Sequence, residues 1–292
     1  MTALAPAVVT ATPEETAAID DVVRRALAED IGDGDLTGAA LLDQDRRCSA
    51  VILQKEDGVV AGLSVAAAAF AALDGRVRFE ALVADGDQVA RGTEVARLDG
   101  PAAAIVGAER TALNLLGRLS GIATLTRRYV DAVAAAGATA KVLDTRKTTP
   151  GLRALEKLAV RIGGGTNHRR GLYDAIIVKD THRRLVGGAG EATRRALAGA
   201  PPGVEVTIEC ESLADVRAAL AAGADRLLLD NMSPALLADA VRLVAGRAVT
   251  EASGGVTLDT VADVARSGVD CISVGALTHS ARCLDVSLEV TS

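Results

Sequence analysis

The sequence predicts an α/β protein in two parts, a small mixed domain followed by a parallel sheet that is either closed into a barrel or doubly wound. From Lys141 onward, short β-branched or aliphatic runs alternate with helical segments, a pattern typical of parallel α/β folds. The region from Arg47 to Gly100 has strand-like periodicity with tight turns. A chain of 292 residues, 49% of them hydrophobic, is long enough for a core of this size.

The first predicted element is a helix with a capping-type start at Thr12-Pro13-Glu14-Glu15, running to about Glu29. Residues 1–13 lack the basic start and long apolar run of a signal peptide, so we interpret them as a flexible tail. The acidic, glycine-rich segment Glu29–Thr37 predicts a loop. Its spacing lacks the closing glutamate of an EF-hand, which disfavours a calcium site there.

The mixed domain is expected to contain strands at Cys48–Gln54, Val77–Val83 and Glu94–Leu98 and a helix at Ser64–Leu73. Pro101 is expected at the first position of a long helix, where its missing N–H costs nothing. That helix is predicted to continue to about Ala136, with a break at Ser120-Gly121.

The second region predicts alternating strands and helices. The expected strands are Lys141–Asp144, Ala175–Lys179, Val204–Glu209, Arg226–Asp230, Ala248–Glu251 and Cys271–Val274. The expected helices are Leu152–Arg161, Glu191–Ala198, Leu213–Ala222, Ala235–Val244 and Leu258–Ser267. A further strand is considered near Leu158–Ile162.

A dense cationic block lies between Asp144 and His182, although the whole chain has a formal net charge of -6. Such a local concentration indicates an anionic ligand rather than a generally basic surface. The block contains Arg146, Lys147, Arg153, Lys157, Arg161, His168, Arg169, Arg170 and Lys179. Arg146, Lys147 and Lys179 follow predicted strands, where parallel α/β folds build their sites. We interpret Arg153, Lys157 and Arg161 instead as a solvated helix face, because they recur at every fourth position.

Charged or polar residues also follow or end other predicted strands, namely Glu209, Asp230 and the pair Glu251 and Ser253. A charge directly after a buried strand usually has a partner or a role, although Asp230 could simply cap the following helix. Carboxylates such as Glu209 and Asp230 suit Mg²⁺ or ribose hydroxyls. The sequence shows no nucleophile triad and no Rossmann or Walker motif, so group transfer by positioning and electrostatics is favoured.

Two glycine turns, Ser253-Gly254-Gly255-Val256 and Val274-Gly275-Ala276-Leu277, each follow a strand and precede a predicted helix. Backbone N–H groups in such turns can hold a phosphate, and the last two loops of a barrel are its usual position.

Composition disfavours several classes of partner. Aromatic residues make up 1% of the chain and the net charge is negative, which argues against nucleic acid. The longest apolar run, Val65–Leu73, is far shorter than the roughly 20 residues that span a membrane, so no membrane partner is expected. The 4 cysteines lack metal-ligand spacing, which fits a reducing cytoplasm.

Several stretches carry a more specific resemblance: DTRKTTPGLRALEK, GGGTNHRRGL, KDTH, IECES, LLLDNMSP and EASGGVTLDTVADVARSGVDCISVGALTHS, with EDIGDGDLT and ERTALNLLGRLSGIAT earlier in the chain. Together they resemble the quinolinate phosphoribosyltransferase family, also called nicotinate-nucleotide pyrophosphorylase (carboxylating). Thr181 and Cys210 differ from its commonest motif, which has asparagine and valine there. The resemblance implies an N-terminal open α/β sandwich at 14–118 and an incomplete, seven-stranded α/β barrel at 119–278, with 279–292 packing back on the sandwich.

The resemblance also implies a homodimer with shared active sites. Quinolinate would be held by Arg146, His168, Arg169 and Lys179, with Arg110 reaching in from the second subunit. Lys147, Glu209 and Asp230 would be catalytic, with Lys147 facing phosphoribosyl pyrophosphate and the two carboxylates serving its ribose and Mg²⁺, directly or through water. The 5′-phosphate would be bound by Ser253, Gly254, Gly255, Val274, Gly275 and Ala276.

The implied reaction joins quinolinate to phosphoribosyl pyrophosphate and yields nicotinate mononucleotide, pyrophosphate and CO₂, a step of de novo NAD biosynthesis. Two alternatives stay open. One is a phosphoribosyltransferase of the same fold that uses another pyridine or azole acid. The other is a non-catalytic anion-binding protein.

Overall fold

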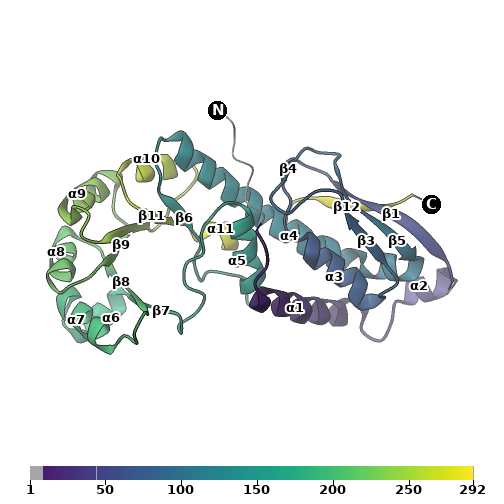
Figure 1. Ribbon diagram of the computed structural model, residues 1–292, viewed down its shortest axis with the longest axis horizontal. Helices are drawn as coiled ribbons and strands as arrows, with labels where there is room; N and C mark the ends of the chain where they lie inside the picture. The colour runs from purple at the N-terminus through teal and green to yellow at the C-terminus, as the bar shows by residue number, and fades with distance from the viewer. Residues whose placement is uncertain (1–8, 44, 292) are drawn as a thin grey trace. The chain divides into compact units, whose positions relative to one another are not determined.

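The computed structural model describes residues 9–43 and 45–291 and divides into two compact units (Figure 1). The first, the sandwich unit, comprises the chain up to Arg127, Thr148–Gly164 and the segment from Ser280. The second, the barrel unit, comprises Arg128–Lys147 and Gly165–His279. The boundaries drawn from the sequence differ chiefly in leaving 148–164 in the barrel. Residues 1–8 of the expected tail lie outside the described residues.

The sandwich unit is built on a four-stranded antiparallel sheet in the order β12-β1-β5-β3. Its strands are β1 (Arg47–Gln54), β3 (Arg78–Ala81), β5 (Glu94–Pro101) and β12 (Val286–Val290), beside the short pair β2 (Gly58–Val59) and β4 (Gln88–Val89). Its helices are α1 (Pro13–Ile31), α2 (Leu36–Leu41), α3 (Leu63–Leu73), most of α4 (Ala102–Ala135) and α5 (Arg153–Ile162). The three predicted strands and the predicted helix between the first two are confirmed.

Helix α1 and its capping box are confirmed. The Thr12 hydroxyl accepts a hydrogen bond from the Glu15 N–H at 3.2 Å, and the Glu15 carboxylate accepts one from the Thr12 N–H at 2.9 Å. Glu15 is fully buried and also pairs with Arg161 of α5 at 2.5 Å. The acidic segment predicted as a loop contains the beginning of the short helix α2, which Asp35 caps by accepting from two backbone N–H groups.

Two predictions about the long helix are wrong. Pro101 ends strand β5, where it pairs with Arg47, and α4 begins one residue later. Helix α4 has no break at Ser120-Gly121, because both residues serve close packing. The Ser120 hydroxyl binds the N–H and the carbonyl of Ala61 at 3.0 and 3.2 Å. A side chain at Gly121 would collide with the carbonyl oxygen of Arg282.

The interpretation of α5 as carrying a solvated cationic face is wrong for Lys157, which is 1% exposed. Nearly every residue from Leu155 to Ile162 is buried, so charge spacing could not reveal an exposed side. The buried Glu156 accepts a hydrogen bond from Arg118 at 2.7 Å. The strand considered near Leu158–Ile162 is also wrong, since this segment is helical.

The barrel unit contains a six-stranded parallel sheet in the order β6-β11-β10-β9-β8-β7. Its strands are β6 (Lys141–Leu143), β7 (Ala175–Val178), β8 (Glu205–Cys210), β9 (Arg226–Asp230), β10 (Val249–Ser253) and β11 (Cys271–Ser273). Its helices are α6 (Asp180–Val186), α7 (Ala189–Gly199), α8 (Leu213–Ala221), α9 (Pro234–Val244), α10 (Val261–Arg266) and α11 (Ala276–His279). Figure 1 shows α7 to α10 along the outer side of the sheet.

All six predicted strands of this sheet are confirmed, as are the helices from α7 to α10. The short helix α6 was not predicted, whereas the helix expected after the turn at Val274–Leu277 is present as α11. Helix α10 begins three residues later than expected, at Val261. The sheet has six strands, one fewer than the seven that the resemblance implies. Next to its edge strand β6, Thr166 forms a single parallel bridge with Leu143.

Within the described residues, no helix is both long enough and apolar enough to cross a membrane.

Candidate functional site

A cavity of about 840 Å³ lies at the carboxyl ends of the barrel strands. Parallel strands deliver these ends to one edge of the sheet, so residues far apart in the chain meet there. The cavity brings together most of the predicted site residues: Arg146, Lys147, His168, Arg169, Lys179, Glu209, Asp230, Ser253, Gly254, Gly255, Gly275 and Ala276. The candidate site therefore combines a cluster of cations with two carboxylates and two glycine turns.

One part of the cavity concentrates positive charge. Arg146 and Lys147 follow β6, and Arg169 lies in the irregular segment that precedes β7. Burial lowers the pKa of the Arg169 guanidinium, and the nearby charge of Arg146 lowers it further. Two guanidinium groups that repel each other, one of them partly desolvated, favour an anionic ligand that neutralises their charge.

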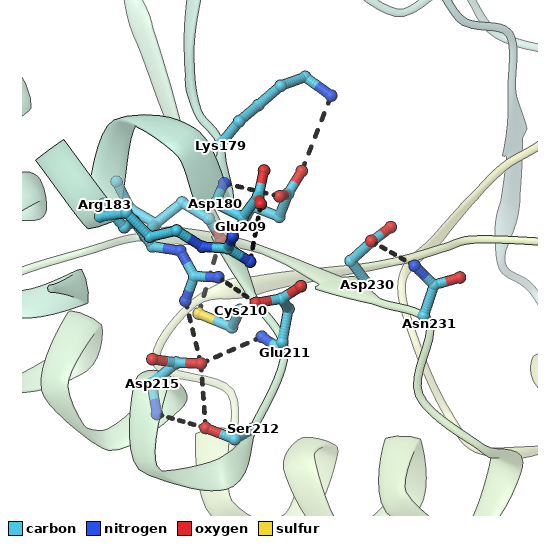
Figure 2. A network of polar contacts seen from close by, with 12 residues as sticks. Lys179, Asp180, Arg183, Glu209, Cys210, Glu211, Ser212, Asp215, Asp230 and Asn231 are labelled. Atoms are coloured by element: carbon cyan, nitrogen blue, oxygen red, sulfur yellow. Dashed lines mark hydrogen bonds and ion pairs between the residues drawn. The ribbon is translucent and has the colours of Figure 1, made fainter.

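Glu209 faces the cavity from β8, and the beginning of α6 holds it in place (Figure 2). One carboxylate oxygen accepts a hydrogen bond from the Asp180 N–H at 2.8 Å, and the other lies 3.7 Å from the Lys179 ammonium. Behind it, the buried Arg183 pairs with Glu211 at 2.8 Å and with Asp215 at 3.0 Å, which joins α6 to the end of β8 and the start of α8. These contacts hold Glu209 in the orientation in which it faces the cavity. We call Arg183, Glu211 and Asp215 the support of Glu209.

Cys210, where the family motif usually has valine, is fully buried beside this support. Burial raises the pKa of its thiol to about 12. A thiol in this state is an inert apolar side chain rather than a nucleophile or a metal ligand.

Asp230 ends β9 and stands apart from the Glu209 group (Figure 2). Its carboxylate accepts a hydrogen bond from the Asn231 side-chain amide at 2.6 Å. Asn231 has a positive φ of 54° and packs against Gly254, whose own φ is 99°. A side chain at Gly254 would collide with Asn231, so glycine is required there both by conformation and by space.

Val274 and Arg110 do not line this cavity. Val274 is 1% exposed and belongs to the core. Arg110 lies on α4 in the sandwich unit, where its side chain is 65% exposed and 3.8 Å from Glu109. Its role as a residue supplied by a second subunit stays a prediction.

The sequence did not single out six other polar lining residues as site residues: Thr145, Asp180, Asn231, Thr257, Ser273 and His279. Glu251 stands out in the sequence only as a charge at the end of a strand. The signal that could have found Ser273 and Glu251 is alternation, because every second residue of a barrel strand points inward. Of the helices expected after the two glycine turns, α11 begins directly after Gly275, whereas α10 begins six residues after Gly255.

The described residues contain no group of three or more His, Cys, Asp or Glu that could hold a metal ion. Glu209 and Asp230 already accept hydrogen bonds from protein groups. This arrangement fits Mg²⁺, which keeps several waters and is commonly held by one or two carboxylates together with substrate phosphates.

Comparison with known proteins identifies the same two parts. Residues 35–120 match the model of the quinolinate phosphoribosyl transferase N-terminal domain, and residues 122–289 match that of the C-terminal domain. The probable nicotinate-nucleotide pyrophosphorylase [carboxylating] of Bacillus subtilis is 44% identical over 263 residues, which cover 90% of either chain. The mitochondrial quinolinate phosphoribosyltransferase [decarboxylating] 2a of Nicotiana tabacum is 42% identical and covers 92% of this chain and 81% of its own.

Solved structures of proteins with similar names have the same fold as this chain. NadC from Streptococcus pyogenes superposes with a TM-score of 0.91 at 41% identity, covering 97% of this chain and 99% of its own. The nicotinate-nucleotide pyrophosphorylase of Francisella tularensis also gives 0.91, at 35% identity, with 98% and 99% covered. The chain therefore belongs to the quinolinate phosphoribosyl transferase family.

Proposed function

We propose that this protein transfers the phosphoribosyl group of phosphoribosyl pyrophosphate to quinolinate with loss of CO₂, the carboxylating nicotinate-nucleotide pyrophosphorylase reaction of de novo NAD biosynthesis. The observation that carries the proposal is the single cavity in which Arg146, Arg169 and Lys179 meet Glu209 and Asp230. A cavity with cations alone would suit any small anion. Carboxylates and glycine turns beside them suit a second substrate that bears both hydroxyls and phosphates.

Quinolinate is a dianion, and the cationic part of the cavity matches it. Arg146 and Arg169 can each form paired hydrogen bonds with a carboxylate, which fixes its plane as well as its position. Lys179, with its side chain 55% exposed, adds a further positive charge to the lining of the cavity. Holding both carboxylates places the pyridine nitrogen toward the ribose.

The phosphoribosyl part is served by the other side of the cavity. Backbone groups of the turns at Gly254-Gly255 and Gly275-Ala276 are available to the 5′-phosphate. Glu209 and Asp230 can accept hydrogen bonds from the ribose hydroxyls and stabilise positive charge that develops on the ring. The Cδ atom of Lys147 lies close to Gly275 of the second turn, which supports a contact between its ammonium and the phosphates.

The chemistry needs no covalent intermediate with the protein. The pyridine nitrogen forms a bond to the anomeric carbon as the carbon–oxygen bond to pyrophosphate breaks, and pyrophosphate leaves with that electron pair. In the resulting pyridinium, the bond to the 2-carboxylate breaks and releases CO₂. The electron pair stays on the ring carbon, which then takes up a proton. The protein contributes orientation and fixed charge.

We also propose Mg²⁺ as the cofactor, with Glu209 and Asp230 near it directly or through water. When bound, it neutralises the pyrophosphate that departs. Removal of divalent metal with EDTA is expected to abolish turnover, and excess Mg²⁺ to restore it. Unchanged turnover in EDTA would contradict this assignment.

We propose a homodimer whose sites are completed by Arg110 of the second subunit, acting in the cytoplasm. The support is the family resemblance around Glu109-Arg110, together with the exposure of the Arg110 side chain. All four cysteines are free thiols, in keeping with a reducing compartment.

The experiment that tests the function is incubation of the purified protein with quinolinate, phosphoribosyl pyrophosphate and Mg²⁺, with nicotinate mononucleotide and CO₂ measured together. Equal amounts of both are expected. Turnover of a different pyridine or azole acid with no reaction of quinolinate would favour another phosphoribosyltransferase. Binding of anions without any product would favour a non-catalytic protein.

A further inference from the structure

Glu251 is a buried carboxylate that none of the roles above uses. It lies in β10, paired with Leu228 of β9 and Cys271 of β11, and it is 1% exposed. One of its oxygens, Oε1, accepts a hydrogen bond from the Ser273 hydroxyl and lies 3.3 Å from Nε2 of His168. Burial raises the pKa of Glu251, but His168 and Ser273 together bring it below the ordinary value. The group is therefore an ionised carboxylate inside the barrel.

His168 connects this carboxylate to the cationic cluster. Its Nδ1 accepts a hydrogen bond from the Arg169 N–H at 2.7 Å, so the ring proton lies on Nε2, the nitrogen that faces Glu251. The His168 N–H donates to Asp144 at 2.8 Å, and the Asn167 side chain donates to the other Asp144 oxygen at 2.6 Å. The segment 167–169 has no helix or strand of its own, so these contacts define its position.

Arg169 is the residue whose placement depends on this segment. Its guanidinium donates to the Ala175 carbonyl at 2.9 Å, while its buried Nε has no hydrogen-bond partner among the described residues. Arg169 and His168 also line a second cavity, of about 850 Å³, at the amino ends of the strands. Side chains beside open space need polar contacts to stay in one orientation.

We propose that Glu251, held by Ser273, is a positioning residue that fixes the orientation of His168 and, through it, the position of Arg169 in the quinolinate site. The identification of the ligand as quinolinate rests on the proposed function. The contacts that join Glu251, His168 and Arg169 are independent of it. The two ring nitrogens of His168 serve Arg169 and Glu251, which makes this histidine a link in the support of the site.

The test uses the full-length enzyme and three variants. Glu251→Leu removes both contacts and is expected to raise the KM for quinolinate at least about tenfold, the equivalent of one lost hydrogen bond to a charged group. The KM for phosphoribosyl pyrophosphate is expected to stay within about twofold. Glu251→Gln keeps an acceptor oxygen for Ser273 and His168 and should rescue most of the loss, and Ser273→Ala should show a smaller effect than Glu251→Leu.

The matched control is Thr250→Val, at the neighbouring residue of the same strand. Thr250 is also buried, and its hydroxyl donates to Asp270 at 2.7 Å. This variant is expected to lower stability without changing the KM for quinolinate. An equal rise in both KM values for Glu251→Leu, or the same quinolinate effect in Thr250→Val, would show a general structural role and overturn the proposal.

A spectroscopic measurement tests the link without activity. The chain has 3 histidines, so ¹⁵N-histidine labelling gives a simple spectrum in which His168 is assigned by its absence in His168→Gln. The proton is expected on Nε2 in the wild type and in Glu251→Gln. In Glu251→Leu the ring is no longer held against the Arg169 N–H, so the proton is expected on both nitrogens in turn. A proton on Nδ1 in the wild type would refute the positioning role. Absence of quinolinate turnover in the wild type would refute the proposed function, and the spectrum would still decide the link.

Discussion

At the scale of single residues, the charged groups of the site differ in whether other protein groups supply their hydrogen-bond partners. Glu209 is fixed by the Asp180 N–H and approached by Lys179, so its geometry is set before any ligand arrives. Arg169, in contrast, keeps a buried donor that no described residue satisfies. Since unsatisfied buried donors are costly, such a group is expected where a ligand supplies the missing acceptor.

Two substitutions are expected to separate the substrates. Arg169→Ala should raise the KM for quinolinate about 10- to 100-fold, the range for losing hydrogen bonds between charged groups, with little change for phosphoribosyl pyrophosphate. Lys147→Ala should raise the KM for phosphoribosyl pyrophosphate, with little change in the KM for quinolinate. Steady-state kinetics with each substrate varied in turn makes the measurement, and each variant is the control for the other. Equal effects on both substrates would contradict the division of the cavity.

The cysteines allow a prediction about reactivity. Burial raises the pKa of Cys48, Cys210 and Cys271, whereas Cys283 is exposed. Only the thiolate is nucleophilic, so iodoacetamide at a pH of about 8 should modify Cys283 alone in the native protein and all four after unfolding. Peptide mass spectrometry reads the result. Modification of native Cys210 at the rate of Cys283 would mean that the support behind Glu209 opens readily.

At the scale of elements, the turn after β10 is the most constrained part of the site. Gly254 combines a left-handed conformation with close contact to Asn231, whose neighbour Asp230 faces the cavity. The turn and the end of β9 therefore hold each other in place.

Gly254→Ala is expected to destabilise the fold by about 1–2 kcal/mol through its backbone conformation and to reduce kcat/KM for phosphoribosyl pyrophosphate strongly through the collision with Asn231. Gly203→Ala is the matched control, because Gly203 also has a positive φ, 80°, but no atom lies within 4 Å of the place that an added Cβ would occupy. Thermal denaturation should show a loss for both variants, and a larger one for Gly254→Ala because of the collision with Asn231. Full activity of Gly254→Ala would show that the turn does not contact the substrate.

At the scale of the whole molecule, the proposed shared site makes activity depend on assembly. If Arg110 acts across a dimer, Arg110→Ala and Lys147→Ala subunits are each nearly inactive alone. After unfolding and refolding together in equal amounts, half of the dimers are mixed and each has one intact site, which restores about one quarter of wild-type activity. The activity of the mixture, compared with each variant refolded alone, gives the answer. No recovery would place Arg110 in its own subunit's site or outside any site.

The sequence predicted the sheet of the barrel unit and most of the cavity, because strand-end charges follow directly from local pattern. It failed where distant packing decides the outcome. Gly121 marks a close approach to a segment more than 150 residues away rather than a helix break, and the helical spacing of Lys157 says nothing about what covers it. The link from Glu251 to His168 was equally hidden, since it joins a strand to an irregular segment more than 80 residues earlier.

The pairing of β12 with β1 has a consequence for synthesis. Residues 286–290 complete the sheet that residues 47–54 begin, so β1 lacks its second neighbour until the ribosome has added more than 230 further residues. During that time β1 is an open edge that can pair with other nascent chains. Contacts this distant in sequence also form slowly. A strand made more than 230 residues after β1 is thus the one that protects β1 from aggregation.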